Sequence, residues 1–236
     1  MSSIHFIGGE KGGVGKSVVS RVLSQFFLDN NLLYAGFDAD QSHGTLTRFY
    51  PEFTESVNLN DFESADTIIE TASEQDINVV VDMPAQSERF LDQWMDENEV
   101  SELSNELGLQ NVYWYVVDDG MDSARLAAKF LRRYSASLPC VIVRNYGRGE
   151  DFSNLEKALD EGGVTATAIM DLPGLHAGTM RKIDKLNLSF WGAGHLTDND
   201  AGTLSMMERQ RSRVWLKKAY SQIAGALTAA GVKTHP

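Results

Sequence analysis

The sequence predicts an α/β fold with a doubly wound, mostly parallel β-sheet and helices on both of its faces. Short apolar, β-branched runs alternate along the chain with amphipathic segments of helical period, as in α/β proteins. A glycine-rich loop separates the first of these runs from the first amphipathic segment. The chain has 236 residues, of which 42% are hydrophobic, so it can bury one large core. We therefore expect a single domain spanning residues 1–236.

The glycine-rich loop follows the strand-like residues 4–7 and precedes an amphipathic segment that starts at Ser17. Glycines let the backbone turn its N–H groups inward, so such a loop can wrap a polyphosphate at the positive end of the next helix. A loop lysine supplies charge for the β and γ phosphates, and a serine in the first helical turn offers its hydroxyl to Mg²⁺. The predicted phosphate site consists of Glu10, Lys11, Gly12, Gly13, Val14, Gly15, Lys16 and Ser17.

This loop departs from the ordinary pattern G-x-x-x-x-G-K-[ST], because Glu10 occupies the position of the first glycine. The run KGGVGKS from Lys11 to Ser17 resembles instead the deviant Walker A motif of the ParA/MinD family of P-loop ATPases. The resemblance extends over the ordered motifs as far as Asn145. It implies a protein that binds ATP and Mg²⁺. In that family the additional lysine reaches the phosphates held by the partner subunit of a dimer, which gives Lys11 a catalytic role; the alternative is a solvated loop lysine.

Two later strand-like runs end in carboxylates. Residues 32–40 place Asp38 and Asp40 at the carboxyl end of a predicted strand, which is the edge where ligands bind in open α/β sheets. Resemblance to the family gives Asp40 the task of orienting the attacking water and places Asp38 near the metal. Alternatively, both aspartates cap a segment that begins at Ser42, because aspartate is a favoured N-cap. Residues 78–82 have the form of a Walker B segment. The predicted Mg²⁺ ligands are Ser17, Asp38 and Asp82.

The alternation continues with strand-like runs at residues 111–117, 140–143 and 164–170. Asn145 follows the second of these runs, and the resemblance implies that it reads the adenine edge; the alternative is a turn asparagine beside Gly147. A GTPase-type Asn-Lys-x-Asp is absent from the sequence at this point, which favours adenine as the base.

The last third of the chain matches the family only in its general α/β character. A long helix is expected over residues 205–231, broken or weakened near Gly225. The aromatic pair Phe190 and Trp191 stands beside glycines, and we expect it to pack in the core rather than to stack on a nucleotide or dock a partner.

The net charge of −12 and the pI near 4.8 disfavour a protein that coats nucleic acid with its whole surface. Acidic residues dominate between Pro51 and Gln110, where Arg89 is the only basic residue. Basic residues gather instead on the C-terminal helix. Arg209, Arg213 and Lys217 recur at one-turn spacing and predict a stripe for sequence-independent DNA binding; a plain solvated face is the alternative. Membrane attachment is less favoured, because the C-terminal residues lack a large apolar face.

The single cysteine, Cys140, lies in an apolar run and allows no disulfide framework. The nitrogenase iron protein and iron–sulfur carriers share the loop, but their dimer-bridging cluster requires two cysteines per subunit. With no basic-then-apolar signal region at its start, the chain is expected to be cytoplasmic.

The resemblance implies a Mg-ATP-dependent homodimerising ATPase that hydrolyses ATP slowly and is stimulated by an adaptor or cargo protein. Such proteins ride on DNA or membrane and position plasmids, chromosomes or protein complexes. Two alternatives of other classes remain. One is an ATP-dependent small-molecule synthetase of the same fold, such as dethiobiotin synthetase. The other is an ATP-gated adaptor with little hydrolysis.

Overall fold

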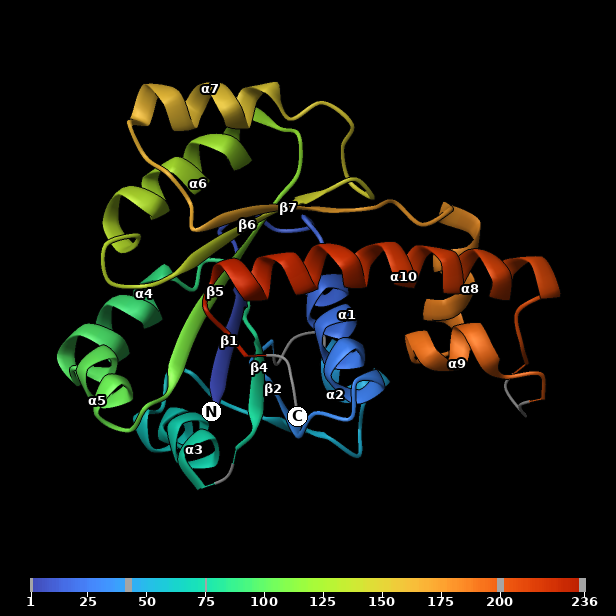
Figure 1. Cartoon of the computed structure of the whole chain (residues 1–236), viewed down its shortest axis with the longest axis horizontal. Helices are drawn as coiled ribbons and strands as arrows, with labels where there is room; N and C mark the ends of the chain where they lie inside the picture. The colour runs from blue at the N-terminus through green and yellow to red at the C-terminus, as the bar shows by residue number, and fades with distance from the viewer. Residues whose placement is uncertain (1, 41–43, 75, 199–201, 234–236) are drawn as a thin grey trace.

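One parallel sheet of seven strands organises the computed structural model, which describes residues 2–40, 44–74, 76–198 and 202–233 (Figure 1). Along the sheet the strand order is β3-β2-β4-β1-β5-β6-β7, and every neighbouring pair is parallel. The strands are β1 (Ser3–Gly8), β2 (Tyr34–Asp38), β3 (Thr54–Ser56), β4 (Asn78–Asp82), β5 (Gln110–Val117), β6 (Cys140–Asn145) and β7 (Ala168–Leu172). The predicted fold class is confirmed.

Helices cover both faces of the sheet, which explains why its central strands are almost continuously apolar. One core lies between the sheet and helices α3 to α7, and the other lies between the sheet and α1, α2 and α8 to α10. The helices are α1 (Lys16–Asp29), α2 (Thr45–Phe49), α3 (Phe62–Glu74), α4 (Glu88–Phe90), the π-helical η1 (Leu91–Asp96), α5 (Val100–Glu106), α6 (Met121–Tyr134), α7 (Ser153–Gly162), α8 (Ala177–Lys185), α9 (Phe190–His195) and α10 (Met206–Ala229).

The structure differs from the sequence expectations mainly in its short and C-terminal elements. Strand β3 and helix α2 were not expected, because neither is long enough to show a periodic apolar pattern. The last helix is not broken near Gly225, since α10 continues through this residue. Buried Ile223, Ala226 and Leu227 anchor α10 on both sides of the glycine, and their packing offsets its low helix propensity. Among the described helices, none has the length and apolar character needed to cross a membrane.

A buried polar network crosses the centre of the sheet at His5 on β1. The Trp114 indole donates to His5 Nδ1 at 3.1 Å, and His5 Nε2 lies 2.8 Å from the Ser3 hydroxyl. That hydroxyl donates to Asn78 Oδ1 at 2.8 Å, so Nε2 carries the proton in this arrangement. His5 is fully buried, and burial lowers its pKa to about 3. The folded protein therefore keeps this imidazole neutral.

The neutral His5 makes stability depend on pH. Between pH 6.5 and about 3, the unfolded chain binds a proton at His5 that the folded chain excludes, so stability falls as the pH is lowered. We expect this residue to contribute a slope of up to about 1.4 kcal/mol per pH unit. Denaturant unfolding at pH 7 and pH 5 should show a shallower pH dependence for His5→Gln than for wild type. The exposed His176→Gln is the matched control, and an unchanged slope in His5→Gln would contradict the expectation.

Candidate nucleotide-binding site

The glycine-rich loop lies at the carboxyl end of β1, the strand that is flanked by β4 and β5. Gly15 is the N-cap of α1 and has a φ of 101°, in the left-handed region that favours glycine. Its carbonyl accepts hydrogen bonds from Val18 and Val19 and so starts the helix. A Cβ atom at Gly15 would lie 2.2 Å from Asn145 Nδ2. This turn and this close approach both require glycine.

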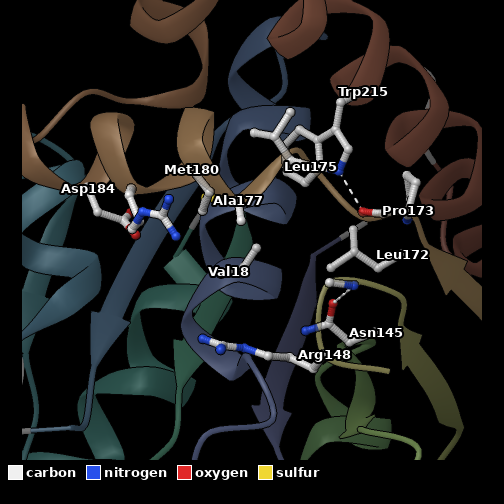
Figure 2. Close-up of a pocket in the computed structure, with 12 residues that line it drawn as sticks. Val18, Asn145, Arg148, Leu172, Pro173, Leu175, Ala177, Met180, Asp184 and Trp215 are labelled. Carbon is white, nitrogen blue, oxygen red and sulfur yellow. Dashed lines mark hydrogen bonds between the residues drawn. The ribbon is translucent and has the colours of Figure 1, made fainter. Parts of the chain in front are cut away.

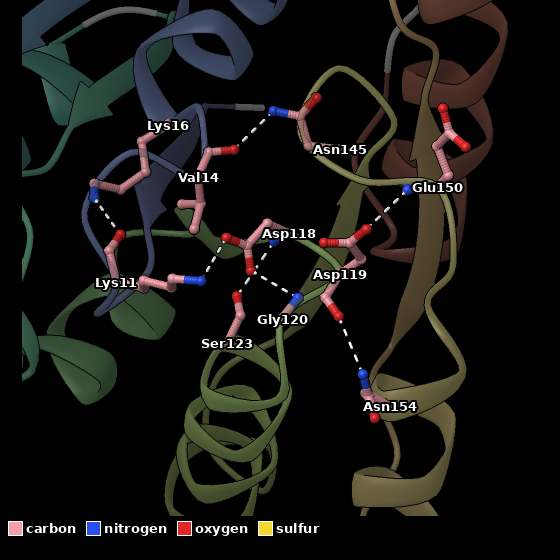
Figure 3. A network of polar contacts seen from close by, with 10 residues as sticks. All are labelled: Lys11, Val14, Lys16, Asp118, Asp119, Gly120, Ser123, Asn145, Glu150 and Asn154. Carbon is pink, nitrogen blue, oxygen red and sulfur yellow. Dashed lines mark hydrogen bonds and ion pairs between the residues drawn. The ribbon is translucent and has the colours of Figure 1, made fainter.

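Lys16 folds back across the loop. Its buried ammonium group donates to the carbonyl of Gly9 at 3.1 Å. It also donates to the carbonyl of Lys11 at 3.4 Å (Figure 3). Burial lowers the pKa of Lys16, whereas Asp82 and Asp40 act in the opposite direction. The lysine is thus a buried cation held by loop carbonyls and by two nearby carboxylates. Phosphate oxygens could replace those carbonyls as its acceptors.

Asp82 ends β4 and is completely buried. Its Oδ1 accepts a hydrogen bond from the Ser20 hydroxyl at 2.8 Å, and its Oδ2 has no hydrogen-bond partner among the described residues. Burial raises the pKa of Asp82 to about 7, the hydroxyls of Ser20 and Ser17 lower it, and Asp38 raises it. Asp38 is also the register partner of Asp82 on the neighbouring strand. The structure therefore brings together the three predicted metal ligands, Ser17, Asp38 and Asp82.

The surroundings of the buried Asp82 Oδ2 indicate whether this site suits Mg²⁺. A buried carboxylate oxygen without a donor is costly unless a proton or a cation meets it. Mg²⁺ in nucleotide sites binds one or two carboxylates together with substrate phosphates, and Asp82 with the nearby Ser17 hydroxyl fits that donor set. In the described part of the chain, no group of three or more His, Cys, Asp or Glu side chains is placed to hold a metal without such phosphates.

Asp38 has a second task in the fold. Its Oδ2 accepts hydrogen bonds from the Thr47 backbone N–H at 3.0 Å and from the Thr47 hydroxyl at 3.2 Å. The N-cap residue of α2 is Gly44, so Asp38 holds the first turn of this helix from strand β2 and is not the N-cap residue that the sequence left open. Ser42, where that segment was expected to begin, lies outside the described residues.

Asp40 lies beyond the end of β2, so strand alternation does not fix its direction. Its backbone N–H donates to Asp38 Oδ1 at 3.2 Å, and its carbonyl accepts from Gly44. The charge of the half-buried Asp40 carboxylate raises the pKa of Lys16, which indicates that this carboxylate lies close to the phosphate loop. Its role in orienting water stays a prediction.

Lys11 has a charge partner within its own chain, Asp118, which follows β5 (Figure 3). Lys11 Nζ and Asp118 Oδ2 are 2.6 Å apart. Burial opposes ionisation of Asp118, but Lys11, together with hydrogen bonds from Gly120 and Ser123, outweighs it and lowers the pKa of Asp118. Sequence reasoning missed Asp118. The signal that could have found it is that residues 111–117, like the two earlier strands, run directly into an aspartate.

Glu10 joins the loop to the chain that follows β4. Its Oε1 accepts a hydrogen bond from the Glu88 N–H at 3.0 Å. Its own N–H donates to the Tyr115 hydroxyl at 3.4 Å. Burial is the main cause of the raised pKa of Glu10. A glycine, the residue of the ordinary motif, could not make the side-chain contact.

A cavity of about 330 Å³ lies beside the first turn of α1, between the ends of β6 and β7 and helix α8 (Figure 2). Asn145 lines it, donates from Nδ2 to the Val14 carbonyl at 2.7 Å and accepts from the Gly147 N–H at 2.9 Å. A carboxamide keeps one further N–H and one further lone pair, so Asn145 can still meet a base edge. Sequence reasoning missed the other lining residues, which include Val18, Arg148, Leu172, Pro173, Met180, Asp184 and Trp215.

The aromatic pair near α9 divides between core and surface. Phe190 is buried and packs against Trp215 with ring centroids 4.8 Å apart, as expected for a core residue. Trp191 is 47% exposed and stacks on His195, so the core expectation is wrong for this residue.

The predicted basic stripe lies on α10. Arg209 is half-buried and donates to the Leu204 carbonyl at 2.7 Å. Arg213 donates to Gln210 Oε1 at 2.7 Å and to a carbonyl of α9 at 3.4 Å. Lys217 is exposed. Two of the three side chains therefore also bind their own chain.

The parallel sheet and the glycine loop that leads into α1 give this chain the architecture of P-loop nucleotide-binding proteins. More particularly, it has the fold of MinD. The septum site-determining protein MinD from Pyrococcus horikoshii OT3, complexed with Mg-ADP, superposes with a TM-score of 0.56 at 17% identity, over 95% of this chain and 98% of that one. A chain of the MinC:MinD cell division protein complex of Aquifex aeolicus superposes with a TM-score of 0.55 at 10% identity, over 95% of this chain and 96% of that one. The resemblance to the ParA/MinD family is thus confirmed at the level of the fold.

Two curated proteins are similar in sequence. Protein TraL of Escherichia coli is 24% identical over 242 residues, which cover 96% of this chain and 99% of TraL. Protein MobD of Acidithiobacillus ferrooxidans is 27% identical over 186 residues, covering 72% of this chain and 78% of MobD. No protein-family model matches the sequence.

The geometry of the loop predicts that two of its glycines respond differently to substitution. Gly15→Ala should destabilise the protein by about 1–3 kcal/mol, because the residue has a positive φ and its Cβ would collide with Asn145. Gly12→Ala should change stability by less than about 0.5 kcal/mol, because a Cβ there meets no atom within 4 Å. Denaturant midpoints measure both. Equal effects of the two substitutions would mean that the loop has a different conformation in solution.

Proposed function

We propose that this chain binds Mg-ATP, forms a homodimer around the nucleotide and hydrolyses ATP, and that it positions or partitions cargo as ParA/MinD-type ATPases do. The observation that carries the proposal is that buried Lys16 and buried Asp82 lie close enough at the glycine loop for their charges to interact, while Asp82 Oδ2 has no hydrogen-bond partner among the described residues. The Pyrococcus MinD structure contains Mg-ADP, which supports the same ligand class for this fold.

The residues of the site would divide the work as follows. Lys16 would exchange the Gly9 and Lys11 carbonyls for phosphate oxygens, and the N-terminus of α1 would add its positive dipole. Ser17 and Asp82 would hold Mg²⁺, with Asp38 close by; when bound, the ion supplies charge that neutralises the β and γ oxygens. Asp40 would orient the attacking water, and the cavity at Asn145 would take the adenine.

Lys11 has two competing partners in this proposal. In the single chain it is bound to Asp118, and in the dimer it would meet the phosphates held by the partner subunit. The two positions exclude each other, so the ion pair must open before Lys11 can act on the other subunit. Phosphate carries more charge than one carboxylate, which favours the exchange when nucleotide is present.

The surface on which the dimer acts is proposed to be DNA, contacted without sequence preference through α10. An adaptor or cargo protein would stimulate hydrolysis, in line with the solved complex of MinD with MinC. The proposed role places the protein in the cytoplasm.

The two lysines of the loop give the test of the proposal. Lys16→Ala should abolish Mg-ATP binding, because it removes the buried charge that faces the triphosphate. Lys11→Ala should bind Mg-ATP within a few-fold of wild type but lose the ATP-dependent dimer and most turnover, since a charge supplied in trans is worth about 10³ to 10⁵ in rate. Calorimetry, size-exclusion chromatography with ATP and phosphate release, with and without DNA, measure the three steps.

Asp118→Asn is the matched control for Lys11→Ala, because it also breaks the ion pair but leaves the lysine in place. It should retain the dimer. If both variants lose the dimer equally, the ion pair itself supports dimerisation and the trans role of Lys11 fails. Binding of ATP by wild type without phosphate release, even with DNA, would identify an ATP-gated adaptor instead. Turnover that depends on an added small molecule would identify a synthetase.

The proposed DNA surface predicts a salt-dependent effect of charge reversal. The double variant Arg213→Glu with Lys217→Glu should abolish ATP-dependent DNA binding, because each reversed charge repels a phosphate that the cation had neutralised. Each lost phosphate contact should also reduce the magnitude of the slope of log K against log salt by about 0.9. Arg209 is left intact because it also anchors Leu204. Lys157→Glu, on the exposed side of α7, is the control and should bind normally. Binding to vesicles with no binding to DNA would replace DNA by membrane as the surface.

A further inference from the structure

A second cavity, of about 570 Å³, lies on the other side of the phosphate loop from the cavity at Asn145. It is formed by residues 39–40, which follow β2, by residues 58–62, and by residues 84–93, which follow β4. Its volume is within the range of small-molecule sites. Among the residues of the proposed nucleotide site, only Asp40 lines it. The proposed ATPase therefore leaves this cavity without a role.

The cavity contains the single basic residue of an acidic region, Arg89. The two acidic residues nearest to it along its own segment are engaged elsewhere: Glu88 pairs with Lys129 at 3.2 Å, and Asp92 pairs with Arg133 at 2.8 Å. Both of those cations belong to α6, which contributes no residue to the cavity lining described. The guanidinium of Arg89 is therefore available to an anion in the cavity, and its planar fork matches a carboxylate.

The remaining lining is rich in hydrogen-bonding groups. Four carboxamides line the cavity: those of Asn58, Asn60, Gln86 and Gln93. Ser87 also lines it and is only 3% exposed. Its hydroxyl lies beside the buried hydroxyl of Tyr113. A hydroxyl has one donor and two acceptor lone pairs, so this pair keeps capacity for a further hydrogen bond to a bound molecule or water.

The local backbone is unusual at the same place. Gln86 has a φ of 62°, in the left-handed region that non-glycine residues seldom occupy. After α4 comes the π-helical η1, and its Gln93 lines the cavity. Single π-helical turns occur frequently at functional sites.

We propose that this cavity is a second ligand site, which binds a small polar molecule through a carboxylate held by Arg89, with the carboxamides and Ser87 orienting the rest of it. The site goes beyond the proposed ATPase. Asp40 lies at its border and also acts on Lys16, so the bound molecule lies next to the triphosphate position. The cavity suits a small anion better than a large polyanion, because Arg89 is the only cation among the described residues that line it.

Glutarate is a suitable probe, and its diamide, glutaramide, is the matched uncharged molecule. Trp94 of η1 stacks on Phe90, a lining residue, with ring centroids 5.2 Å apart, so its indole N–H signal reports on the cavity. In the full chain labelled with ¹⁵N-tryptophan, and at constant ionic strength without nucleotide, glutarate should shift this signal saturably. Glutaramide should bind at least about tenfold more weakly, as removing one charge-assisted pair predicts.

Arg89→Gln should weaken glutarate binding by at least about tenfold, whereas Arg125→Gln, an exposed residue of α6, should leave it unchanged. Thermal unfolding checks that both variants are folded. No saturable shift with glutarate, equal binding of glutaramide, or equal binding of glutarate by Arg89→Gln would each overturn the proposal. None of these readouts involves ATP, so the proposed ATPase and the second site can fail independently.

Discussion

The structure depends on placing opposite charges out of water at the ends of adjacent parallel strands. Lys16 follows β1 and Asp82 ends β4, and both are buried. Neither charge could be buried alone at an acceptable free-energy cost, so each requires the other, the loop carbonyls or a ligand. The parallel sheet meets this requirement, because it brings the carboxyl ends of separate strands to one edge. The glycine loop and the first helix are built around that edge.

The strand order then divides the site into two halves. On one side of β1 are β4 and β2, which end in Asp82 and Asp38 and carry the proposed metal and water chemistry. On the other side are β5 and β6, which lead to Asp118 and Asn145. These two residues hold the loop itself, one through Lys11 and the other through the Val14 carbonyl. These two contacts lie on the side opposite to the one on which hydrolysis is proposed, whereas Glu10 holds the loop from the β4 side.

This division explains what could be predicted from the sequence. The loop, Asp38 and Asp82 were predictable because each is a local pattern, a glycine frame or an apolar run that ends in a carboxylate. The pairing of Lys11 with Asp118 joins residues 107 positions apart and depends on which strand lies next to β1, so no local pattern contains it. The continuity of α10 at Gly225 was also unpredictable, because packing rather than propensity decides it. The cavity at Arg89 combines three separate segments and could be found only in the fold.

Glu10 connects these parts and gives a reason for the departure from the ordinary loop motif. Its backbone belongs to the phosphate loop, and its carboxylate accepts the N–H of Glu88, which adjoins Ser87 and Arg89 of the second cavity. Glu88 in turn pairs with Lys129, so the segment after β4 is held between the loop and α6. A glycine at position 10 would leave the Glu88 N–H without this acceptor. The substitution that makes the loop atypical is thus the one that joins the nucleotide site to the lining of the second cavity.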